Sequence, residues 1–191
     1  MLLRTKANGR PYHLGTYPLE ILPRDASIIV HETAKDPLPM ARQCCCSKGP
    51  LAKALRDYLD IFVGNAVREP AASKAPVPDD NHRRMVDVKG YSCFMNASQV
   101  GICRIPDNAW CTDGDRQAHH DFAVVLLLAH GRVPETGNPA RAWIEPAVQD
   151  GADARIGGIA VCLAGHISQL GWSAEPHVMG AGSVDEKRLA V

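Results

Sequence analysis

The sequence lacks a long apolar run. Its longest, at residues 122–129, is far too short to span a bilayer, and the first residues show none of the basic, apolar and small-residue regions of a signal peptide. An excess of charge is also absent, because 21 Lys and Arg residues balance 21 Asp and Glu residues. We therefore expect no membrane and no nucleic acid among the partners.

Spaced cysteine pairs are absent as well. The sequence has seven cysteines but no C-x-x-C, and Cys44, Cys45 and Cys46 are consecutive. Zinc and iron–sulfur sites use spaced ligands, so this pattern favours exposed thiols in a loop and, at single positions such as Cys162, buried small residues. An odd cysteine count does not fit a secreted disulfide framework, which predicts a cytoplasmic protein.

The histidines form no recognisable site. His119 and His120, with Asp115 and Asp121 nearby, offer nitrogen and oxygen atoms, but adjacent histidines rarely bind one metal, which favours a solvated loop. We expect His166 to be half-buried on a helix, because the sequence places no acid beside it that would make it a base.

Catalytic motifs are also missing. The sequence contains neither G-x-S-x-G nor a P-loop, and His31-Glu32 starts a zincin-like string in which Lys35 replaces the second ligand. Residues 180–185 resemble the start of a dinucleotide fingerprint, but Asp185 stands where the third glycine belongs, so we interpret them as a loop. The motifs assign no catalytic residue and no metal ligand.

What is present is an ordinary globular composition. The 191 residues are 46% hydrophobic, which is enough for a buried core in one domain. Apolar residues at helical spacing predict a helix from Pro50 to about Gly64, with Tyr58 in the core. A second helix starts at an N-cap among residues 79–81 and runs toward Phe94.

The third predicted helix, at residues 154–170, has the clearest amphipathic pattern. Gly171 stands where a left-handed C-terminal cap belongs, and Trp172 is expected to fold back on Ile167. Gly157 and Gly158 inside this helix predict the close approach of another backbone. The last residues, 185–191, have helical composition and no stop signal.

Four short segments have strand character, at residues 28–30, 100–103, 122–129 and 175–178. Residues 122–129 do not alternate, which fits a strand buried on both faces, and a two-turn buried helix is the alternative. Helices alternating with short strands favour an α/β or α+β layered domain.

The chain divides by composition into three parts. Residues 1–67 hold an N-terminal arm rich in turn formers, a short strand and the first helix. Residues 68–81 are linker-like, with three prolines. Residues 82–191 form the α/β core segment, which we expect to be truncated at its C-terminal end.

Several segments together resemble the soluble, non-exported reductive dehalogenases. The segments that carry the resemblance, in the family's order, are residues 10–15, 17–20, 96–106, 109–110, 122–128, 159–167, 170–174 and His177. The string at 96–106, NASQVGICRIP, is similar to the family's D-A-S-x-V-G-I-C-R-L-P.

The resemblance implies an oxidoreductase with a nitroreductase-like fold that removes halogen from aromatic compounds. Such enzymes use a corrinoid (cobalamin) and two [4Fe–4S] clusters, and the corrinoid supplies the difficult chemistry. The family's cluster cysteines, tyrosine proton donor and most corrinoid contacts lie beyond Val191. The resemblance therefore gives this chain no catalytic residue and no bound cofactor of its own.

Three hypotheses follow. In the first, the chain is the N-terminal portion of a reductive dehalogenase, structural in itself, whose partner is the remainder of the polypeptide or a second chain. In the second, it is a stand-alone, non-catalytic partner-binding or scaffold module; a homo-oligomer is a separate expectation about its partners. In the third, it is a small flavin- or corrinoid-binding protein related by fold only.

Overall fold

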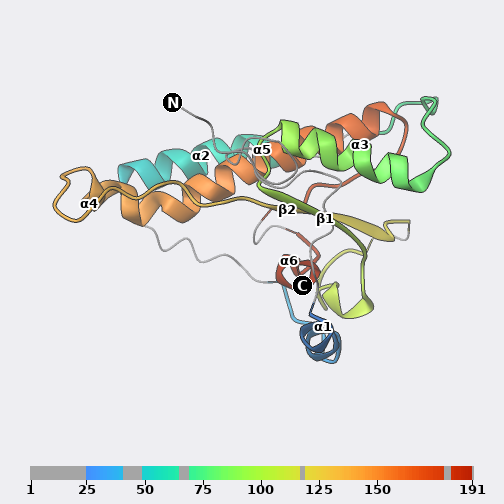
Figure 1. The fold of residues 1–191 in the computed structure, drawn as a ribbon, viewed down its shortest axis with the longest axis horizontal. Helices are drawn as coiled ribbons and strands as arrows, with labels where there is room; N and C mark the ends of the chain where they lie inside the picture. Colours follow the sequence, from blue (N-terminus) through green and yellow to red (C-terminus); the bar gives the residue numbers. More distant parts are fainter. Residues whose placement is uncertain (1–24, 41–48, 65–68, 117–118, 179–181, 191) are drawn as a thin grey trace, which may run out of the picture.

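A computed structural model describes residues 25–40, 49–64, 69–116, 119–178 and 182–190. Within them, three long helices lie on one side of a small antiparallel sheet, and two short helices lie on the other (Figure 1). This mixture of helices and a small antiparallel sheet agrees with the predicted α/β (α+β layered) class. Among the described helices, none combines the length and the apolar character needed to cross a bilayer.

The longest helix is α5 (Val148–Gln169), which continues from the short helices α4 (Arg141–Ile144) and η3 (Glu145–Ala147). It begins six residues before the predicted start, because it forms a helical unit with these two short helices. Its larger buried apolar residues lie on two sides of the helix, Ile159 and Leu163 on one and Val161 on the other. The helix is therefore covered from two directions.

The predicted cap of α5 is confirmed. Gly171 has a φ of +89°, its amide donates to the carbonyl of Ser168 (3.0 Å), and the amide of Trp172 donates to the carbonyl of Ile167 (3.3 Å). These two bonds define a Schellman motif, which satisfies carbonyls that the helix leaves open.

Helix α2 (Pro50–Gly64) packs along α5, as the apolar spacing predicts. A Cβ at Gly157 would lie 2.5 Å from Cδ1 of Leu59, and one at Gly158 would lie 3.5 Å from Cζ of Phe62. The two glycines therefore accept side chains of α2, not another backbone as predicted. The prediction for Tyr58 is wrong: its side chain is 54% exposed and contacts Phe62 edge to face.

Helix α3 (Asn81–Phe94) covers β1 and touches α5. Asp80 is its N-cap, and its carboxylate accepts a hydrogen bond of 2.8 Å from the amide of His82. The preceding residues follow the end of α5, where the amides of Ala71 and Ala75 donate to the carbonyls of Ser168 and Leu170.

The sheet of the described residues is a pair of antiparallel strands, β1 (Gln99–Arg104) and β2 (Phe122–Leu127), with Gln99 opposite Leu127. Both predicted strands are confirmed, which excludes the helical alternative for residues 122–129. Burial on both faces is not complete, because Phe122 is 64% exposed and the inner residues are half-buried. A strand with a single neighbour cannot be shielded on every side.

Two predicted strands are wrong. Residues 28–30 lie in helix α1 (Ala26–Thr33), whose N-cap Asp25 accepts a hydrogen bond of 2.9 Å from the amide of Ser27. Ile28 and Val30 are exposed, so the cap and not burial decides this segment. Residues 175–178 form no strand, and Val178 packs beside Gly157 of α5.

Helix α6 (Glu186–Leu189) falls within residues 185–191, whose composition predicts a helix. It lies beneath the sheet in Figure 1. Its buried Arg188 joins three segments by donating to the main-chain carbonyls of Asn108 (2.5 Å), Asp36 (2.6 Å) and Lys35 (3.4 Å). Asp185 balances the charge at 3.3 Å. These contacts hold the stretch that follows α1 against the short helix η2 (Asp107–Ala109).

Candidate functional site

A pocket of about 370 Å³ lies between β2, α5, α6 and the segment at residues 173–178. One wall comes from β2, at residues 123–126. The opposite wall comes from α5, through Ile156, Ala160, Leu163 and Ile167. Their spacing of four, three and four residues places these side chains in one row along the helix.

Small residues on α5 widen the pocket. Ala160 and Ala164 lie among the larger side chains of the lining and leave space that Leu or Ile would occupy. The helical pattern that buries α5 therefore also creates the hollow beside it.

The pocket lining also includes polar groups. His120 and Ser173 share a hydrogen bond of 2.9 Å between Nε2 and Oγ, which joins the start of β2 to the segment after α5. The described residues that line the pocket include two acidic residues, Glu175 and Glu186, but no Lys or Arg.

Burial disfavours the charged form of His177. Burial lowers its pKa below the ordinary value of 6.5, the neighbouring Glu175 works against this shift, and His120 adds to it. Its Nδ1 is enclosed and makes no hydrogen bond among the described residues. Gly182 is packed so closely against the ring that a Cβ there would collide with it.

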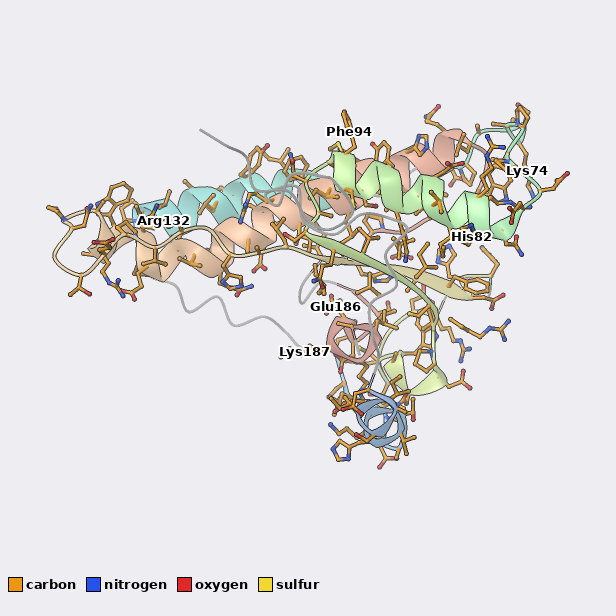
Figure 2. All side chains as sticks on the ribbon, in the orientation of Figure 1. Lys74, His82, Phe94, Arg132, Glu186 and Lys187 are labelled. Atoms are coloured by element: carbon orange, nitrogen blue, oxygen red, sulfur yellow. The ribbon has the colours of Figure 1, made fainter. Side chains whose placement is uncertain are left out.

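Glu186 lies on the side of α6 that faces the sheet (Figure 2). Burial raises the pKa of its carboxyl above 4.5, which its own main-chain amide partly opposes. The charges of Asp185 and Asp153 add to the increase. Burial against an apolar wall thus disfavours the ionised form of this carboxyl.

Of the histidines singled out in the sequence, His119 and His120 contact each other, and His31 and His166 lie on separate helices. His119 contacts the ring of His120 edge to face at 5.5 Å between centroids, and His31 lies in the last turn of α1. His166 is exposed, not half-buried as predicted, and stacks on Tyr91.

The cysteines are also separate. Cys44, Cys45 and Cys46 lie outside the described residues, and the prediction of a buried Cys162 is wrong because this thiol is exposed on α5. In the parts of the chain that the structure describes, no group of three or more His, Cys, Asp or Glu residues is placed to hold a metal ion. The described residues therefore do not fit an iron–sulfur cluster.

Sequence reasoning missed the pocket. In the sequence, His177 is marked only by the family resemblance, and Glu186 only by the helical composition of residues 185–191. The available signal was the pair of small residues Ala160 and Ala164, since small side chains on a core-facing side of a helix mark a hollow. Nothing in the sequence indicates that α6 returns to close it.

Comparison with solved structures identifies where this fold occurs. The catabolic reductive dehalogenase NpRdhA matches with a TM-score of 0.71 and 30% sequence identity, over 83% of this chain and 23% of that chain. Its complex with 3-bromo-4-hydroxybenzoic acid gives the same values. A reductive dehalogenase structure described as suggesting a mechanism for B12-dependent dehalogenation matches at the same identity and TM-score.

These matches confirm the predicted resemblance to reductive dehalogenases in both fold and sequence. This chain spans less than a quarter of the length of those enzymes. No family model matches the chain, and the search of curated proteins found no match. The pocket is of the size that holds a drug-sized molecule, and a corrinoid is several times larger, so the pocket does not fit a whole corrinoid.

Proposed function

We propose that this chain is the N-terminal portion of a cobalamin- and iron–sulfur-dependent reductive dehalogenase that acts on halogenated aromatic compounds. The observation that carries the proposal is the match over 83% of the chain at 30% identity. Two of the matched relatives support its chemistry: one is described as B12-dependent, and another is complexed with a brominated aromatic acid.

In this proposal the segment is structural. It supplies the three-helix layer, the hairpin and the Arg188 contacts as a scaffold, and the corrinoid and the two [4Fe–4S] clusters bind outside it. The corrinoid supplies the halogen-removing chemistry when bound. A nitroreductase-like core for the complete protein and a cytoplasmic location belong to the same proposal.

The described tyrosines support a structural role. A proton donor must be placed beside the reacting atoms. Tyr58 is exposed on α2, where its ring contacts that of Phe62, and the ring of Tyr91 stacks on His166. Neither lines the pocket. We therefore place the donor, like the cluster ligands, elsewhere in the complete protein.

Exposed aromatic residues favour an extensive partner. Phe94 projects away from the end of α3 with 80% of its surface exposed (Figure 2), and Phe122 and Trp143 are 64% and 56% exposed. We propose that the remainder of the same polypeptide covers such residues, or that a second chain does. A partner-binding module without catalysis, including a homo-oligomer, is the second candidate that these side chains support.

The test compares two proteins. The 191-residue chain and the longest open reading frame that contains it are purified and assayed for bromide release from 3-bromo-4-hydroxybenzoic acid. The assay is anaerobic, with cobalamin and a strong reductant, and free cobalamin gives the background.

We expect bromide release above background only from the longer protein. Release by the 191-residue chain would place the chemistry inside the segment and overturn its structural role. A reading frame that stops after Val191, with no release, would overturn the dehalogenase proposal and favour the partner-binding module.

A further inference from the structure

The size of the pocket between β2 and α5 corresponds to a small molecule. Its volume of about 370 Å³ is more than twice that of the roughly 150 Å³ apolar cavity known to bind benzene in another protein. It also lies near the lower end of the roughly 300–1,000 Å³ range of small-molecule sites. A ligand larger than one benzene ring is therefore needed to fill it.

The shape of the pocket favours a flat ligand. The strand residues 123–126 and the helix row containing Ala160 and Leu163 form opposing apolar walls. Flat rings bury two faces against such walls at little loss of conformational entropy. The hydrogen-bonded pair of His120 and Ser173 provides polar atoms at the edge of the space.

The charges around the pocket select against anions. Among the described residues that line it, the acidic ones are Glu175 and Glu186, and none is a Lys or Arg that would pair with a bound carboxylate. Moving a carboxylate from water to an apolar wall without a cation is strongly unfavourable. Burial lowers the pKa of His177, which disfavours the charged form of this ring.

We propose that this pocket binds an uncharged, planar compound of about two fused rings between β2 and α5, and that it excludes carboxylates of the same shape. This site goes beyond the proposed dehalogenase function. The aromatic acid bound by the relative carries a carboxylic acid group, which this pocket disfavours. The proposal therefore concerns a different ligand class, and it can fail while the dehalogenase proposal stands.

The experiment uses a matched pair of probes, indole-3-acetamide and indole-3-acetate, which have nearly the same shape and differ in charge. Binding is measured by calorimetry at pH 7.5 to the 191-residue chain and to the longest open reading frame that contains it. We expect indole-3-acetamide to bind at least tenfold more tightly than indole-3-acetate. 3-Bromo-4-hydroxybenzoic acid, used as a second anion, should not displace indole-3-acetamide.

A variant locates the binding. Ala160→Leu adds side-chain volume to the pocket wall and should weaken indole-3-acetamide binding at least tenfold. The matched control is Ala54→Leu, because Ala54 is an exposed residue of α2. This control should bind as the wild type does. If Ala160→Leu does not fold, nuclear Overhauser contacts in the wild-type protein, from bound indole-3-acetamide to the Ala160 and Leu163 methyl groups, locate the site instead.

Three results would overturn the proposal. They are equal affinity for the two indole probes, ligand contacts to methyl groups outside the pocket, and binding by the 191-residue chain that is lost in the longer protein. The last result would show that a side chain from the remainder of the polypeptide fills the pocket.

Discussion

The ring of Tyr91 on α3 lies parallel to the imidazole of His166 on α5, with 4.8 Å between centroids and 5° between planes. Contacts between these two helices are otherwise sparse. The stacked pair is thus a specific point at which α3 is fixed to the central helix.

We predict that this pair couples the two helices energetically. In a double-mutant cycle of Tyr91→Ala and His166→Ala, the interaction energy should be about 0.5–1.5 kcal/mol, as for stacked aromatic pairs. The free energies of unfolding are measured in urea. Strictly additive effects of the two substitutions would show that the stacking contributes nothing to stability.

Leu163 should be a major contributor to the core. It is 4% exposed on the inner face of α5, so Leu163→Ala should lower the free energy of unfolding by about 2–5 kcal/mol. Gln169→Ala on the exposed face of the same helix should change it by less than about 0.5 kcal/mol. Similar losses for both variants would mean that the inner face of α5 is wrongly assigned.

The prediction for Arg188 concerns a buried charge. Arg188→Met keeps the apolar stem but removes the donors to three carbonyls and the partner of Asp185. We expect a loss of about 3 kcal/mol in the free energy of unfolding. Lys187→Met, at an exposed neighbour on α6, is the control and should have little effect. An Arg188→Met variant with the free energy of unfolding of the wild type would contradict a stabilising role for Arg188.

Glu186 should make stability depend on pH in an unusual direction. Because burial raises the pKa of its carboxyl, the folded state holds the proton more tightly than the unfolded state does. Its contribution to stability is therefore complete below pH 4.5 and is lost as the pH rises through the higher folded value.

Glu186→Gln, which cannot ionise, should consequently gain stability relative to the wild type as the pH rises above 4.5. Urea unfolding across pH 4–8 measures this difference. Glu175→Gln serves as the control, because Glu175 is exposed at the pocket. A difference between Glu186→Gln and the wild type that does not vary with pH would refute the prediction.

The sequence predicted the elements whose pattern is local and repeated. The spacing of apolar residues defines α2 and α5, Asp80 caps α3, and Gly171 adopts the left-handed conformation that its position predicts. Each of these signals acts within a few residues along the chain, so reading the sequence was sufficient.

The errors have the opposite origin. Ile28 and Val30 have strand propensity, but in an exposed segment the cap at Asp25 outweighs it. Cys162 is a small apolar residue next to the buried Leu163, yet its thiol faces outward. The buried sides of α5 are set by where α2, α3 and the sheet pack. These outcomes depend on contacts between distant parts of the chain.

The candidate site was the least predictable part of the molecule. His120 meets Ser173 across more than fifty residues, and Glu186 reaches the pocket only because α6 returns beneath the sheet. The polar residues of the pocket come from separate segments. No spacing in the sequence relates them, and only the folded chain brings them together.

The Arg188 guanidinium binds its neighbours through main-chain oxygens at positions 35, 36 and 108, and these exist whatever side chain is attached. Substitution at Lys35 or Asp36 therefore leaves these acceptors in place. Inserting or deleting one residue between α1 and position 36 would instead shift both acceptors by about 3–4 Å, beyond hydrogen-bond reach. This stretch should thus tolerate changes of residue type but not changes of length.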